Sequence, residues 1–143
     1  MAKGRADYTQ AVDVADQTVD RISTITKAPS GTTQVFKNGI AAGGTSLLHT
    51  VATGKSLYMT GLFIAINSLD TSSPVNISVQ DENDIWQYYL FKTTPRATLD
   101  NSANMALSID IIPPQEITEG WDIKIYTGNA GVLLSVSLSG WEE

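Results

Sequence analysis

The sequence has 143 residues, enough for one domain with a hydrophobic core and a tail. Its formal net charge of −6 disfavours binding to nucleic-acid phosphates or anionic membrane surfaces, because both depend on clustered Lys and Arg. The lack of cysteine excludes disulfides, thiolate metal sites and cysteine nucleophiles, and no apolar run reaches the roughly 18 residues of a membrane span.

Residues 1–44 are weakly hydrophobic and predict an N-terminal arm and linker, ahead of a β-sandwich domain at 45–143. Near the start, apolar residues at i, i+4, i+7, i+11 and i+14 would form one stripe on a helix. They are Tyr8, Val12, Ala15, Val19 and Ile22. Because Val, Thr and Asp are poor helix formers, such a helix alone would be marginal. We therefore expect an arm, helical or extended, that becomes ordered on a partner; packing on its own domain is the alternative.

The glycines of 39–44 lack the Lys-Ser/Thr that follows in a phosphate-binding loop, so this run predicts a flexible connector. From Thr45 onward, short apolar runs with turn residues between them alternate at the period of half-buried strands. We expect strands at 46–51, 55–67, 75–80, 85–92, 104–112, 122–126 and 132–139, with an extra one near 33–37. Residues 57–66 are apolar on both faces, which predicts a central strand covered on both sides.

Several short strands at near-regular spacing predict an all-β fold, either a sandwich or a barrel. A β-sandwich of the jelly-roll type is the favoured member of that set. Proline and glycine in the intervening segments, such as Pro113-Pro114, support the strand boundaries.

Catalysis is not expected from the ionisable residues. His49 is the only histidine, and no G-x-S-x-G motif supplies a nucleophile for it, so a strand histidine with local hydrogen bonds is favoured over a catalytic base. Glu116 and Glu119 could form an acid–base pair of the glycosidase type, but they read as part of a loop that enters a strand. The sequence predicts no enzyme and no cofactor.

The densest acidic cluster is Asp81, Glu82 and Asp84. Three carboxylates in one turn could supply some ligands of a calcium ion, but the spacing does not match an EF-hand loop. A solvated hairpin turn is favoured over a metal site.

One expected strand carries four aromatic side chains: Trp86, Tyr88, Tyr89 and Phe91. Exposed Trp and Tyr could form a sugar-binding platform, since their rings stack while their polar groups hydrogen-bond. A strand buried on one side by the core and on the other by a neighbouring subunit is favoured instead. On that interpretation Trp86 is an interface candidate.

Three stretches resemble the small β-sandwich proteins of tailed-bacteriophage virions: 48–61, where a turn with Gly54 leads into a long strand with Tyr58, then 117–123 and 138–143. The resemblance implies a capsid decoration (cement) protein or a head or tail accessory protein. Such proteins commonly form trimers or other symmetric assemblies and bind a lattice through arms and loops.

These observations together predict a virion structural protein of the decoration type. Its partners would be the major capsid protein or other virion proteins, and it would form a homo-oligomer, with a trimer favoured. The alternative is a receptor- or carbohydrate-binding head of a phage tail fibre that uses Trp86 and the loops. Deleting residues 1–30 should abolish capsid binding by a decoration protein and leave a receptor-binding head active.

Overall fold

A computed structural model of the chain describes residues 28–68, 72–95 and 103–143. The predicted arm residues Tyr8, Val12, Ala15, Val19 and Ile22 lie outside the described residues. The described part consists of strands and turns. The strands are β1 (Thr33–Ala42), β2 (Gly44–Thr50), β3 (Leu57–Ser68), β4 (Val75–Gln80), β5 (Trp86–Thr93), β6 (Ala103–Ile117), β7 (Asp122–Thr127) and β8 (Val132–Glu142).

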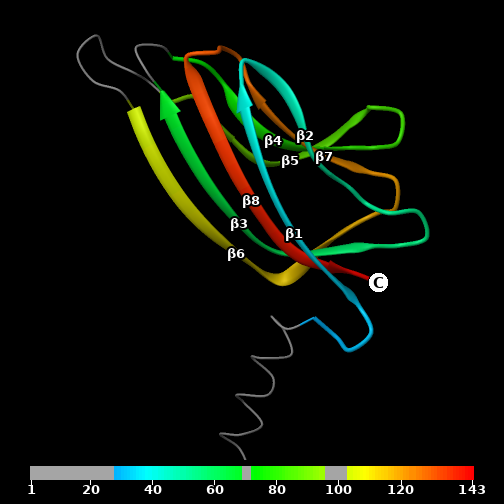
Figure 1. Cartoon of the computed structure of the whole chain (residues 1–143). Helices are drawn as coiled ribbons and strands as arrows, with labels where there is room; N and C mark the ends of the chain where they lie inside the picture. The colour runs from blue at the N-terminus through cyan, green and yellow to red at the C-terminus, as the bar shows by residue number, and fades with distance from the viewer. Residues whose placement is uncertain (1–27, 69–71, 96–102) are drawn as a thin grey trace, which may run out of the picture.

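The strands form two antiparallel four-stranded sheets that lie face to face (Figure 1). The front sheet has the order β1-β8-β3-β6, and the back sheet has the order β2-β7-β4-β5. Strand β1 pairs with β8, β2 with β7, β3 with β6 and β4 with β5, as in one long antiparallel ribbon folded over on itself. These pairings are those of a jelly roll. The prediction of an all-β sandwich is confirmed.

The core lies between the sheets and follows the alternation in the sequence. On β3, Leu57, Met59 and Ile64 are fully buried, and Ile77 and Ile125 of the back sheet are equally inaccessible. Burying each such side chain stabilises the fold by roughly 1.5–3 kcal/mol before conformational entropy is counted. The inward-facing half of each interior strand is therefore fixed by its own domain.

The sandwich begins earlier than the boundary expected at residue 45. Strand β1 pairs with β8 from Thr33 opposite Glu142 to Ala42 opposite Leu133, so the extra strand expected near 33–37 is present and longer. The expected flexible connector at 39–44 is mostly strand. Only Gly43 separates β1 from β2, and the φ angles of Gly43 and of Gly44, the first residue of β2, are +73° and +112°, which suit glycine.

Strand β6 does not end at Ile112 as expected, but continues through Pro113 and Pro114 to Ile117. Its pairing with β3 jumps from Gly61–Asp110 to Met59–Gln115, so extra β6 residues bulge out of the ladder. Because β6 is an edge strand, the missing proline N–H groups need no partner in the sheet. Proline therefore interrupts the pairing without ending the strand.

Candidate functional site

His49 is joined to a carboxylate across the two sheets. Its Nε2 lies 2.8 Å from Oε1 of Glu142, and both side chains are about nine-tenths buried. The same carboxylate oxygen also accepts the N–H of Ala52 at 3.4 Å. The histidine therefore links β2 to β8. Local hydrogen bonds were expected, but its partner lies far along the sequence.

Glu116 and Glu119 have separate surroundings. Glu119 accepts a hydrogen bond from the backbone N–H of Gly54. Glu116 lies beside Tyr58, where burial together with the charges of Glu116 and Glu143 raises the pKa of the phenol. Each of these carboxylates is thus tied to a different neighbour, and neither contacts His49.

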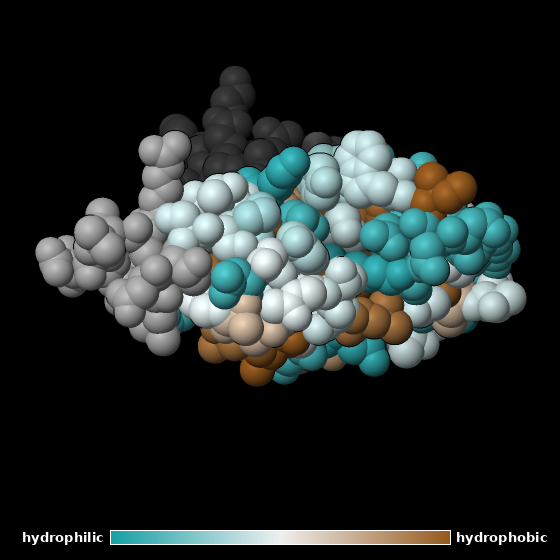
Figure 2. All heavy atoms as spheres, turned by 90° about the horizontal axis from the view of Figure 1, so that it is seen from above, coloured by the Kyte–Doolittle hydropathy of each residue, from teal (hydrophilic) through white to brown (hydrophobic). Residues whose placement is uncertain are grey.

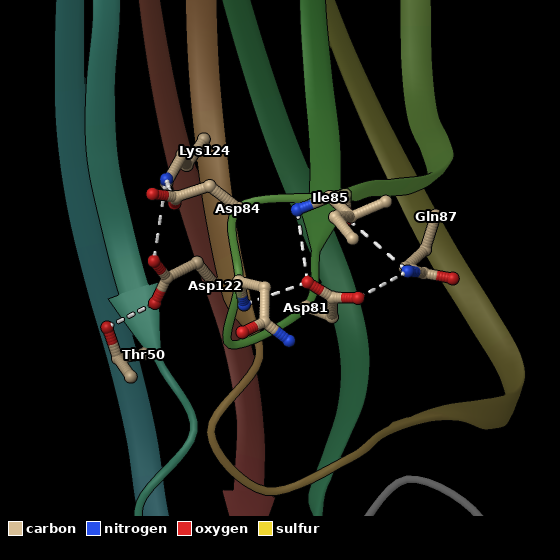
Figure 3. A network of polar contacts seen from close by, with 8 residues as sticks. Thr50, Asp81, Asp84, Ile85, Gln87, Asp122 and Lys124 are labelled. Atoms are coloured by element: carbon tan, nitrogen blue, oxygen red, sulfur yellow. Dashed lines mark hydrogen bonds and ion pairs between the residues drawn. The ribbon is translucent and has the colours of Figure 1, made fainter.

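The acidic cluster builds the β4–β5 hairpin (Figure 3). Asp81 Oδ1 accepts the backbone N–H groups of Asn83 at 2.9 Å and Ile85 at 3.0 Å, and Oδ2 accepts Gln87 Nε2 at 3.0 Å. Asp84 takes a positive φ of 62°, which Asp tolerates better than most residues. The Asp81 carboxylate is thus occupied by donors of its own turn. Among the described residues, no group of three His, Asp or Glu side chains is placed to hold a metal ion.

Asp84 also ties the hairpin to β7. Its carboxylate accepts from Lys124 Nζ, which lies 3.6 Å from Asp122 Oδ2, and Thr50 in turn donates to Asp122 at 2.5 Å (Figure 3). The hydrogen bond to Asp84 raises the pKa of Lys124, although burial of the amine opposes it. One ammonium and two carboxylates thus lie together beside the start of β7, with a net charge of −1.

The outer face of the front sheet exposes hydrophobic side chains that no described residue covers. They are Phe36 at 69%, Ile40 at 62%, Phe63 at 49% and Leu133 at 42% exposure. We call this surface the front face. It consists of the outward-facing residues of β1 from Phe36 to Ala42 and of the residues paired with them across β8, β3 and β6. Figure 2 shows hydrophobic residues gathered on the side where this sheet lies. The expectation that β3 is covered on both faces is therefore wrong within the described chain.

The front face is nearly uncharged and unevenly shaped. Its outward positions carry Ser135, Ser137 and Ser139 on β8 and a single charged residue, Asp110, on β6. Three shallow hollows lie on it, and Phe63 borders two of them. Small side chains beside protruding rings give a surface on which another protein can interdigitate.

Sequence reasoning missed this face because it treated residues 39–44 as a connector. The available signal was Phe36 and Ile40, two large apolar residues four positions apart, which lie on the same face of a strand.

The outer face of the back sheet carries a different kind of surface. Trp86 and Tyr89 lie there with ring centroids 5.1 Å apart, while Tyr88 and Phe91 pack against the core. Within the described part of the chain, the Trp86 side chain is 51% exposed. A strict period of two would put Trp86 and Tyr88 on one face. Two register shifts between β4 and β5 change this and bring Trp86 and Tyr89 together.

No protein-family model matches the chain, and no curated protein matches it. No helix in the described ranges is long and apolar enough to cross a membrane. Among solved structures, the chain is similar to two crystal structures of a pentameric capsid protein isolated from metagenomic phage sequences. Identity is 13% in both, with TM-scores of 0.45 and 0.44 over 85% and 84% of this chain. The chain spans 66% of the length of these proteins.

Proposed function

We propose that the chain is a structural, non-enzymatic component of a virus particle, of the capsid decoration (cement) type. It would bind the major capsid protein or another virion protein and assemble as a homo-oligomer, with a trimer favoured. The jelly roll is one of the folds of viral capsid proteins, which supports the proposal by analogy of fold. The observation that carries it is the uncovered front face with Phe36, Ile40 and Phe63.

Exposed hydrophobic residues gathered on one sheet face favour an interface over a solvated surface. Burying the ring of Phe63 in an interface would stabilise the complex by about 25 cal/mol for each Å² of apolar surface removed from water. Because Asp110 is the one charged residue on the front face, burying this face would leave almost no ionised group without a partner. The serines of β8 could keep hydrogen bonds through their hydroxyls or through trapped water.

The front face alone is small for a stable interface. With about 4.8 Å between strands and about 3.4 Å per residue, it measures about 14 by 20 Å, on the order of 300 Å². A standard interface buries about 800 Å² on each partner. The proposal therefore includes a second contact, made by the N-terminal arm. Its stripe of Tyr8, Val12, Ala15, Val19 and Ile22 would gain on a neighbour the contacts that offset its ordering entropy.

The test is binding of the full chain to shells assembled from the major capsid protein of the virus that encodes it. Phe63→Asp puts a charge at the centre of the front face, and Ile85→Asp makes the matched change at a 58%-exposed residue of the β4–β5 hairpin. The proposal expects Phe63→Asp to abolish co-sedimentation with shells and Ile85→Asp to retain it. Equal binding by both variants would contradict it.

The alternative function, a receptor- or carbohydrate-binding head of a tail fibre, needs an exposed site for a ligand. Trp86 on the back sheet is the observation that favours it. The alternative predicts that shell binding is absent from the wild type as well, because the front face would then serve the fibre.

A further inference from the structure

A hollow on the outer face of the back sheet combines aromatic rings with uncharged polar side chains. It is lined by Asn76, Ser78 and Gln80 of β4, Trp86 and Tyr89 of β5, and Tyr126 of β7. The pairing of β4 with both neighbours sets this arrangement, because Asn76 lies opposite Tyr126, Ser78 opposite Tyr89, and Gln80 opposite Trp86. Three adjacent strands thus hold the groups in fixed positions.

The two aromatic rings form an exposed, buttressed corner. Trp86 and Tyr89 are 51% and 42% exposed, and their planes meet at 47°. Lys92 places its ammonium 4.7 Å from the Tyr89 ring centroid, which holds that ring through a cation–π contact. Trp86 therefore offers a broad apolar surface beside a ring whose orientation is restrained.

The amides around the rings have hydrogen-bonding capacity to spare. Within the described part of the chain, the side chains of Asn76 and Gln80 make no hydrogen bond to protein, although both are half-buried. Each amide offers two N–H donors and one carbonyl acceptor. A ligand in the hollow would thus meet donors and acceptors on β4 and an apolar ring on β5.

Two cations lie near the hollow, and each is already in contact with another group. Lys124, on the strand next to Ser78, is held by Asp84 and Asp122 (Figure 3). The Lys92 ammonium lies over the Tyr89 ring. The six lining residues named above include no ionised group. The site is therefore complementary to an uncharged ligand that has one apolar face and hydroxyl groups at its edge.

We propose that this hollow binds a neutral hexose unit of a glycan. The C–H face of the sugar would stack on Trp86, and its hydroxyls would hydrogen-bond to Asn76 and Gln80. A nucleic-acid base could stack in the same way, but its phosphates would meet a protein of net charge −6. Glycan binding uses the back sheet and does not depend on assembly through the front face.

Saturation-transfer NMR on the full chain tests the site, with methyl glycosides of glucose, galactose and mannose as probes at millimolar concentration. At least one glycoside should receive magnetisation on its C–H protons, and Trp86→Ala should weaken that binding about tenfold or more. Asn76→Ala should also weaken it, while Ile85→Ala, a change at the exposed neighbour of Trp86, should leave it unchanged.

Circular dichroism melting of each variant separates loss of the site from loss of the fold. The proposal is overturned if none of the glycosides binds the folded wild type, or if folded Trp86→Ala binds as well as the wild type. Binding confined to sialylated glycans, added as a separate probe, would contradict the neutral ligand. Capture of peptides alone would show that the rings serve a protein partner instead.

Discussion

His49 and Glu142 form a polar contact of 2.8 Å that joins the second strand of the chain to the last one, across the two sheets of the sandwich. Backbone hydrogen bonds extend this tie, since Ser56 and Glu143 exchange N–H to carbonyl bonds of 2.9 and 3.2 Å. The end of β8 is therefore held both by the front sheet and by a side chain of the back sheet.

Breaking the His49–Glu142 contact should destabilise the fold. Glu142→Ala leaves the imidazole and the Ala52 N–H without their acceptor, and we expect the free energy of unfolding to fall by about 1–3 kcal/mol. Urea denaturation followed by circular dichroism measures the change. Glu82→Ala, at an exposed hairpin position, is the control and should have little effect. An unchanged midpoint for Glu142→Ala would show that the contact adds nothing.

The Asp81 carboxylate should matter as a turn-forming group. Asp81→Ala removes three acceptor contacts from the β4–β5 hairpin and should lower the free energy of unfolding by about 1–2 kcal/mol. Asn83→Ala, which keeps the backbone donor, should cost much less. Thermal melting measures both variants. A rise in the wild-type melting temperature on adding calcium chloride would show instead that the cluster binds a cation.

Stability should fall at high pH, in part through Lys124. Asp84 raises the pKa of the folded-state amine, so the contribution is fully present below the unfolded pKa of about 10.4 and is lost as pH rises through the higher folded value. Lys124→Met should flatten the alkaline limb of a stability–pH curve. Part of the alkaline limb should remain in this variant, because burial also raises the pKa values of Tyr58 and Tyr88. Raised phenol pKa values likewise lower the stability of the fold as pH rises. A slope identical to the wild type would contradict this assignment.

The N-terminal stripe should be needed for binding to the particle. Val12→Asp with Val19→Asp charges the stripe, and the full chain should then lose binding to capsid shells while keeping its melting temperature. Gln10→Asp with Gln17→Asp adds the same charge away from the stripe and should bind normally. Co-sedimentation compares the two pairs. Equal loss in both would point to charge alone, and normal binding by both would exclude the stripe.

Periodicity predicted the interior strands well, since a strand packed on a core must alternate. Val75–Gln80 matches its expected bounds, and Val132–Glu142 begins where expected. The errors lie where pairing overrides local preference. Pro113 and Pro114 stay within β6 because an edge strand tolerates them, and Gly39 lies within β1 although glycine read as a connector.

The surface sites were harder to predict because faces depend on register. The pairing of Trp86 with Tyr89 follows from two shifts between β4 and β5, which no spacing of two reveals. The front face depends on β1 lying beside β8, a pairing of segments about a hundred residues apart. Sequence alone gave Trp86 as an interface candidate but could not assign it to a face.

The most direct test of the structural role is cryo-electron microscopy of the particle that carries this chain, at a resolution that shows side chains. The proposal predicts copies on the capsid shell, with Phe36, Ile40 and Phe63 buried against a neighbouring chain and residues 1–30 ordered against a partner. Copies at the tip of a fibre, with the front face exposed to solvent, would contradict it.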